Sequence, residues 1–240
     1  MTATMPETRK AFHEEIADLT TEVVRLGALA CQSIEMGTKA LLDADLAAIE
    51  KVVAHDNEQL DPLTHSIEQR ACLLLARQQP MAIDLRTLVT VLRVIHEIER
   101  VGDLMVKVAK STRRLYPQQL SPKVRGLIDR MRQQAGSQLQ LAVDAFAQRD
   151  VSRAEALPDM DDVMDDLQRD LFQAIFSTPL VEADDSASGG SAEEGRLQTA
   201  VNIALVGRHF ERMADHAVNI ADRVAFMVTG HFSYEDHDED

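Results

Sequence analysis

Apolar residues recur along the chain at intervals of three and four, which is the spacing of one buried face of an α-helix. The first such pattern runs from about residue 8 to about 43, and a second continues from about 46 to 78 after a short polar break. A third occupies about 82–115 and ends at "YPQQLSP", where two prolines stop a helix. Three long helices are therefore predicted in the first half. The first apolar face is carried by Phe12, Ile16, Leu19, Val23, Leu26 and Ala30.

The same order of elements returns in the second half. Helical patterns occupy about 122–148, 151–178 and 194–229, and the middle pattern contains Pro158 as its counterpart in the first half contains Pro62. A kink or a break can occur at each proline, because proline lacks the amide hydrogen that a helix interior uses. No segment alternates with a period of two, so no sheet is expected. The predicted fold class is all-α, with six long helices in two tandem three-helix bundles.

The two halves also match residue by residue in their third helices. "EIERVGDLMVKVA" at 97–109 aligns with "HFERMADHAVNIA" at 209–221, with a constant offset of 112. An offset close to half of the chain length indicates an internal duplication. The predicted bundles span 8–116 and 121–230, with flexible termini at 1–7 and 231–240 and a mobile acidic Gly/Ser stretch at 182–195.

Each third helix carries an acidic stripe, because residues four apart lie on one helical face. Neighbouring carboxylates repel each other, and hard oxygen ligands on facing helices can share a metal ion that cancels the repulsion. The second stripe is expected to bind metal better, since it has oxygen-bearing side chains where the first has Lys107 and Lys110. The candidate ligands are Glu99, Asp103, Glu211, Asp215, Asn219 and Asp222, with Asp56, Asp61, Asp161 and Asp165 from the second helices.

An alternative is that these carboxylates belong to salt bridges within the protein, since acidic stripes without an ion are common on solvated faces. The residues leave both interpretations open. His96 lies close to the first stripe and is a weaker candidate ligand. The arginines close enough in sequence to act as counter-charges are Arg86, Arg100, Arg208 and Arg212.

Composition excludes several function classes. The net charge of −15 argues against nucleic acid and against unaided binding to anionic membranes, since both need clustered Lys and Arg. No apolar run approaches the length of a membrane span, the first residues lack the apolar core of a signal peptide, and two cysteines form no disulfide framework. A cytoplasmic location is therefore expected.

No catalytic constellation stands out either. Ferritin-like di-iron enzymes place a Glu three residues before a His, and none of the eight histidines has an acidic residue there. Nucleotide-binding, serine-hydrolase and kinase motifs are missing from the sequence. A non-catalytic binding protein is expected. The alternatives are a helical adaptor that binds no metal and a metal-dependent hydrolase.

The duplicated motifs "ERVGD" and "ERMAD", together with "RQQPMAIDLR" at 77–86, resemble the PhoU family of bacterial phosphate-specific transport proteins. The resemblance covers about 10–230. It implies two three-helix bundles side by side, and acidic motifs that hold iron or zinc in some members. It also implies a negative regulator that mediates between the phosphate ABC transporter, including its ATPase subunit, and a membrane sensor histidine kinase.

The chain departs from this family pattern in two respects. The first motif is followed by Lys107 and Lys110 where the second is followed by Asn219 and Asp222, and the second half has the acidic Gly/Ser stretch where the first half has the Q-P-x-x-x-D-L-R turn. With the resemblance, the expected ion is iron, zinc, manganese or magnesium. Long amphipathic helices with a spare apolar stripe are compatible with a homodimer, and contact with the membrane is expected only through partners.

Overall fold

The computed structural model describes residues 5–78, 80–181 and 190–231. Most of the termini predicted to be flexible, and residues 182–189 of the acidic stretch, lie outside the described residues. Residues 5–7 and 190–195 are already helical, so the first and last helices both begin earlier than the apolar periodicity predicted. Residues 190–195 contain no large apolar side chain and residues 5–7 contain only Met5, so neither start contributes to the apolar period.

The first half contains three long helical segments. The first is α1 (Met5–Leu42) and the third is α4 (Ile83–Leu115). The middle segment joins α2 (Leu46–His55), a π-helical turn η1 (Asp56–Leu60) and α3 (Asp61–Gln78). The polar break before α2 works as a helix cap, because the Asp45 carboxylate accepts hydrogen bonds from the amides of Ala47 and Ala48 at 2.9 and 3.1 Å.

The irregularity predicted near Pro62 is the π-helical turn that precedes it. The Asp61 amide donates to the Asp56 carbonyl five residues back, instead of four as in an α-helix. Pro62 follows at once and has no amide hydrogen to donate. The helical direction therefore continues through a widened turn, and this turn places Asp56 in a buried position.

The second half has the same order but a different interruption. It contains α5 (Pro122–Gln148), α6 (Val151–Glu155), α7 (Leu157–Ser177) and α8 (Gly190–Thr229). Here the helix breaks, because Pro158 lies in the first turn of α7, where a missing amide hydrogen is tolerated.

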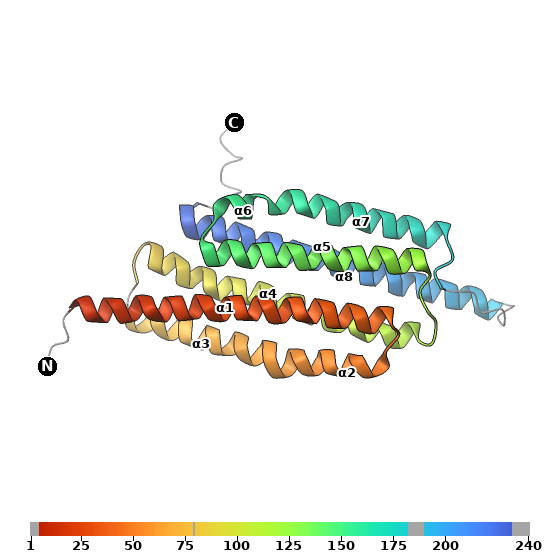
Figure 1. The fold of residues 1–240 in the computed structure, drawn as a ribbon, viewed down its shortest axis with the longest axis horizontal. Coiled ribbons are helices and arrows are strands. Elements are labelled where there is room, and N and C mark those ends of the chain that lie inside the picture. Colours follow the sequence, from red (N-terminus) through yellow and green to blue (C-terminus); the bar gives the residue numbers. More distant parts are fainter. Residues whose placement is uncertain (1–4, 79, 182–189, 232–240) are drawn as a thin grey trace, which may run out of the picture.

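Four long helices, α1, α4, α5 and α8, form the centre of the molecule, and the interrupted segments lie outside them (Figure 1). Contact between the halves is made by α4 along α8 and by α1 along α5. The start of α4 lies beside the end of α8, where Arg86 Nε donates to the Met227 carbonyl at 3.2 Å. One apolar core runs through both halves and includes Leu26, Leu139 and Phe210. The limits 8–116 and 121–230 of two separate bundles therefore stay a prediction.

The described residues contain no strand, and their one β-type pairing is an isolated bridge between Leu120 and Val181. The neighbouring Ser121 amide donates to the Leu180 carbonyl at 2.9 Å. This bridge ties the start of α5 to the residues after α7. None of the described helices combines the length and the apolar character needed to cross a bilayer.

Candidate functional site

Four carboxylates gather on the side of α4 that faces the middle segment of the first half. Glu99 and Asp103 lie one turn apart on α4, and Asp56 and Asp61 come from η1 and the start of α3. Burial, followed by the charges of Asp61, Asp103 and Glu99, raises the pKa of Asp56 to about 6. Burial and the charges of Glu99 and Asp103 also raise the pKa of Asp61. We call Asp56, Asp61, Glu99 and Asp103 the first acidic group.

Asp56 reaches this group because Gly102 leaves room for it on α4. A Cβ atom at position 102 would lie 2.6 Å from Asp56 Oδ1 and 2.9 Å from Leu60 Cδ2. A larger residue would therefore push either the carboxylate or the π-helical turn away from α4. Asp56 is only 7% exposed. Burial is therefore the largest of the influences that raise its pKa.

The second half repeats the arrangement between α7 and α8. Burial raises the pKa of Asp161; the Gln138 amide, which donates to Asp161 Oδ1 at 3.2 Å, acts in the opposite direction, and the charges of Asp215 and Asp165 raise the pKa further. Burial and the charge of Asp215 raise the pKa of Glu211, with Arg208 acting in the opposite direction. We call Asp161, Asp165, Glu211 and Asp215 the second acidic group.

Two of the four arginines predicted as counter-charges pair with these groups. Arg100 donates to Asp103 Oδ2 at 3.1 Å, and Arg208 donates to Glu211 Oε1. Both pairs join residues three apart on one helix, with an arginine that is more than half exposed. Such pairs contribute little stability, so they offset only part of the repulsion within each group.

The other two predicted arginines lie elsewhere. Arg86 of the Q-P-x-x-x-D-L-R turn donates to the backbone of α8, as described above. Arg212 lies close to His209, whose pKa is lowered by burial and then by the charges of Lys107 and Arg212. Arg86 therefore ties the start of α4 to the end of α8, and the role of Arg212 as a counter-charge stays a prediction.

His96 is a hydrogen-bond partner of the first acidic group in this arrangement. Its Nδ1 lies 3.1 Å from Glu99 Oε2, and its Nε2 lies 3.8 Å from Glu68 Oε1 on α3. The imidazole thus bridges α3 and α4 at the edge of the group. Its role as a metal ligand stays a prediction.

The two acidic groups differ in nearby positive charge. Lys110 lies close enough to the first group to lower the pKa of Asp56, as its position in the sequence predicted. Lys107 lies close enough to His209 of α8 to lower the pKa of that imidazole, and its predicted role beside the first group stays a prediction. The first group therefore has a lysine that partly neutralises it.

Asn219 and Asp222 lie away from the second acidic group that they were predicted to extend. The Asn219 amide donates to Glu97 Oε2 of α4 at 3.4 Å, and the same oxygen lies 2.7 Å from His216 Nδ1. Asp222 is seven residues beyond Asp215, or about 10 Å along the helix axis. Ligands of one ion lie about 2 Å from it, so Asp215 and Asp222 are too far apart to share an ion.

The second acidic group suits a hard cation in its donor atoms, although its side chains do not surround one. Within the described ranges, no three His, Cys, Asp or Glu side chains converge closely enough to hold an ion. The Glu211 Oε2 atom is nevertheless buried without a hydrogen-bond partner. A buried carboxylate oxygen normally has a partner, so a cation there would satisfy an atom that the protein leaves unpaired.

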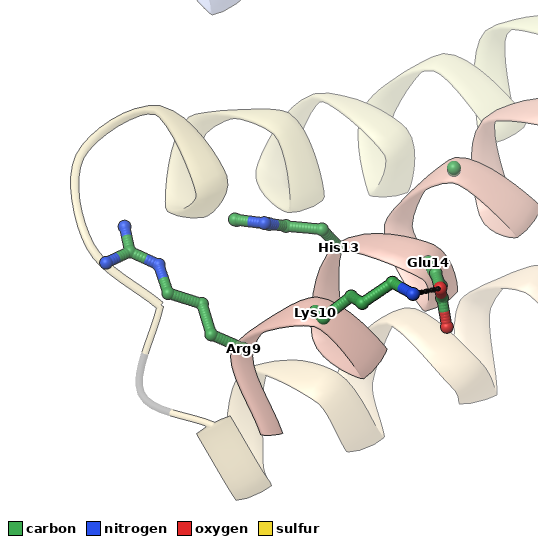
Figure 2. A pocket seen from close by; sticks show the side chains of 5 residues that line it. Arg9, Lys10, His13 and Glu14 are labelled. Carbon is green, nitrogen blue, oxygen red and sulfur yellow. Dashed lines mark ion pairs between the residues drawn. The ribbon is translucent and has the colours of Figure 1, made fainter. Parts of the chain in front are cut away.

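A surface pocket at the start of α1 lies away from both acidic groups. It is lined by Arg9, Lys10, His13, Glu14 and Ala17. Lys10 and Glu14 point toward each other and form an ion pair at 3.6 Å (Figure 2). His13 lies 3.4 Å from Asp84, the aspartate of the Q-P-x-x-x-D-L-R turn. Two of its three basic side chains are thus already paired within the protein, and no ligand follows from this pocket.

Three features of the site were not predicted from the sequence. Gln138 of α5 donates to Asp161, and Glu97 and His216 pair across the junction of the halves. These contacts join residues that no motif connects. The third is Gly102, which interrupts the apolar pattern of α4 and could have been noticed as a position of close approach.

Comparison with known proteins gives consistent matches over both halves. The family model described as "PhoU domain" matches residues 23–112 and again 128–224, which confirms the predicted duplication. The Mycobacterium tuberculosis phosphate-specific transport system accessory protein PhoU homolog 1 is 36% identical over 229 residues, 95% of this chain and 97% of that protein. PhoU homolog 2 of the same organism is 36% identical over 225 residues, 93% of this chain and 99% of that protein.

Solved structures agree on the fold. The crystal structure of PhoU from Pseudomonas aeruginosa superposes with a TM-score of 0.79 at 26% sequence identity, covering 92% of this chain and 100% of that chain. The predicted all-α architecture of six long helical segments in two repeats is therefore confirmed.

Proposed function

This chain belongs to the PhoU family, and on that premise we propose that it is a non-catalytic regulator of phosphate uptake. It works by binding, mediating between the ATPase subunit of a phosphate ABC transporter and a membrane sensor histidine kinase. The observation that carries the proposal is the pair of family matches, one on each half, together with relatives named as accessory proteins of phosphate-specific transport. The proposal places it in the cytoplasm as a homodimer that reaches the membrane through its partners.

Deleting the gene from its host is expected to leave phosphate-starvation genes expressed in phosphate-rich medium, because the restraint on the sensor kinase is lost. The measurement is a reporter fused to a starvation-induced promoter, compared in rich and poor phosphate. A plasmid copy of the gene is the control and should restore repression. Mycobacterium tuberculosis has two PhoU homologs. A second copy in the host could replace the deleted one, so every family member of the host must be deleted. Full repression in that strain would contradict the proposal.

We also propose that the second acidic group holds a metal cation, with Asp161, Asp165, Glu211 and Asp215 as ligands. The expected ion is iron, zinc, manganese or magnesium. Two observations support this choice over the first group: Glu211 Oε2 is buried and unpaired, and the first group already has the charge of Lys110. A bound cation would offset the mutual repulsion of the carboxylates without any catalytic step.

Thermal unfolding with and without added divalent cation tests this metal site. An ion that binds only the folded protein stabilises it by about 2.7 kcal/mol at one hundred times its dissociation constant. The wild type should gain melting temperature by that mechanism, and Glu211→Ala/Asp215→Ala should gain much less. The matched control is Glu99→Ala/Asp103→Ala, which removes the equivalent pair from the first group and should keep most of the gain.

The comparison uses only the gain that each variant shows on adding the ion, because removing like charges changes the starting stability as well. Equal gains in the wild type and in Glu211→Ala/Asp215→Ala would exclude the second acidic group as the site. No gain in the wild type with any of the four metals would leave a regulator whose carboxylates serve only as salt-bridge partners.

A further inference from the structure

The exposed surface along α7 and α8 is divided into an acidic zone and an apolar zone. On α7, Asp161, Asp165, Phe172 and Phe176 follow one another at intervals of four, seven and four residues, so they lie on one side of the helix. On α8, Leu197, Val201, Glu211 and Asp215 share a side in the same way, at intervals of four, ten and four. Each helix thus has its acidic residues at one end of the stripe and large apolar residues at the other.

The two stripes are aligned, because α7 and α8 pack together and run in opposite directions (Figure 1). A close approach fixes the register: a Cβ atom at Gly207 would lie 2.6 Å from Leu171 Cδ2. Five residues beyond Leu171, Phe176 comes opposite position 202, next to Val201. The acidic residues meet at the other end, where Asp161 is influenced by Asp215 and Glu211 by Asp165.

The apolar zone, defined as Phe172, Phe176, Leu197 and Val201, is unusually exposed for side chains of this size. Phe176 is 86% exposed, Leu197 is 67% exposed and Val201 is 52% exposed. The first half has no aromatic counterpart, since the only exposed large apolar residue described on α3 is Leu73. Contiguous exposed apolar surface next to polar residues is typical of an interaction site.

We propose that this surface binds an amphipathic helix of a protein partner that carries lysines or arginines at one end and large apolar side chains at the other. The apolar side chains lie on Phe172, Phe176, Leu197 and Val201. The basic ones lie against the second acidic group in its metal-free form, so this partner and a metal ion compete for the same carboxylates. Asp165 and Phe172 are seven residues apart, so the partner's basic and apolar residues are separated by about 10 Å, or two helical turns. This surface deepens the proposed function, on which it rests, by naming the chemistry of one partner.

Charge complementarity favours this partner over a second copy of the chain. Each copy carries a net charge of −15, so a second copy on this surface would bring more negative charge to the acidic zone, whereas a basic segment is attracted to that zone before contact. Helices that lay an apolar face on such a surface are a common mode of peptide recognition. The second copy is therefore treated as the competing occupant in the test.

The binding experiment uses a designed helical peptide with lysines in its first two turns and leucines in its last two, labelled with fluorescein. Fluorescence anisotropy in the presence of a chelator, which keeps the second acidic group free of metal, should show binding at least tenfold tighter than for a peptide in which glutamate replaces every lysine. Phe172→Ala/Phe176→Ala should weaken binding of the lysine peptide at least tenfold. Both aromatic side chains are substantially exposed, so the variant is expected to fold, and its thermal unfolding curve checks this.

The matched control is Val163→Ala, which removes an exposed apolar side chain from the same helix. Val163 is nine residues before Phe172 and so lies on the opposite side of α7, where it is 48% exposed. Binding within twofold of the wild type is expected for this variant. Equal losses in both variants, or none in either, would overturn the proposal. So would a change from dimer to monomer in Phe172→Ala/Phe176→Ala by light scattering, because a second copy would then be the occupant.

The deletion strain separates this inference from the proposed function. Plasmid copies of the wild type and of Val163→Ala should restore repression of phosphate-starvation genes, and Phe172→Ala/Phe176→Ala should not, at equal protein levels. If all three restore repression, the surface is not needed and the inference is wrong while the function stands. If the deletion itself leaves repression intact, the proposed function is wrong, and the peptide measurement alone decides the surface.

Discussion

Replacing Asp56 by asparagine is expected to stabilise the metal-free protein by up to about 3 kcal/mol at pH 7. Burial and three nearby carboxylates raise the pKa of Asp56 from 3.8 to about 6, and each unit of pKa corresponds to about 1.4 kcal/mol of difference between the charged and neutral forms. The surroundings of Asp56 in the folded protein thus disfavour its ionised form. Asparagine keeps the shape and removes the charge.

The effect should depend on pH in a defined direction. Because the folded protein binds the Asp56 proton more tightly than the unfolded chain, the carboxyl group destabilises the fold as pH rises from about 4 to about 6. The difference between Asp56→Asn and wild type should therefore be full above about pH 6 and disappear below about pH 4. Urea unfolding in chelator at pH 7.5 and at pH 4 measures it.

The control for Asp56→Asn is the loss of a carboxylate at the protein surface. Asp18→Asn removes an exposed carboxylate from α1, and such surface changes stay within about 0.5 kcal/mol. If Asp56→Asn instead lowered stability in chelator at pH 7.5, other interactions would be holding the ionised form in place. If it lowered stability only when a metal is added, the first acidic group would be a metal site as well.

Replacing Gly27 by leucine is expected to destabilise the protein by about 3 kcal/mol, the upper part of the range for overpacking a well-packed core. Gly27 lies on α1 where it meets α5, and a Cβ atom there would lie 2.6 Å from Val143 Cγ2 and 3.0 Å from its Cγ1. Valine is stiff at χ1 and cannot turn aside. The larger side chain would therefore push the two halves apart at one of their two helix contacts.

Two further variants separate this steric effect from a change in helix propensity. Gly126→Leu makes the same replacement on α5, where nothing lies within 4 Å of the added Cβ atom, and should raise stability by about 0.5–1 kcal/mol because leucine is the better helix former. Val143→Ala in the Gly27→Leu background should recover at least about 1 kcal/mol. Urea unfolding of the four proteins is the measurement. A Gly27→Leu protein as stable as wild type would mean that α1 and α5 do not approach so closely.

Periodicity along each helix was sufficient to predict most of the architecture. Intervals of three and four residues report which side of a helix is buried, and this information is local. The buried faces of α1 and α4 therefore follow from the sequence, and Phe12, Leu19 and Leu26 are indeed part of the core. The effect of proline was harder to predict, because Pro62 follows a widened turn inside a continuous helical segment whereas Pro158 begins a new helix.

Part of the candidate site was also predicted, because the spacing of residues within one helix shows which of them share a side. Glu211 and Asp215 share a face by spacing alone, as do Glu99 and Asp103, and Asp56 and Asp161 were correctly expected to join them from the second helices. Spacing along α8 gave the wrong partner where the same side of this helix meets a different neighbouring helix one turn further on. Asn219 is one turn beyond Asp215, yet its amide meets Glu97 of α4.

The sequence by itself determined that this protein is all-α, duplicated and acidic on its third helices, because apolar period, constant offset and residue type are properties of the chain. Only the tertiary structure decided how deeply each acidic residue is buried, which arginines pair with it and which surfaces stay apolar and exposed. Those outcomes depend on which helices meet and how closely, as at Gly102 beside Asp56 and Gly207 beside Leu171. Contacts between residues far apart in the sequence set these distances, and no pattern within a single helix contains them.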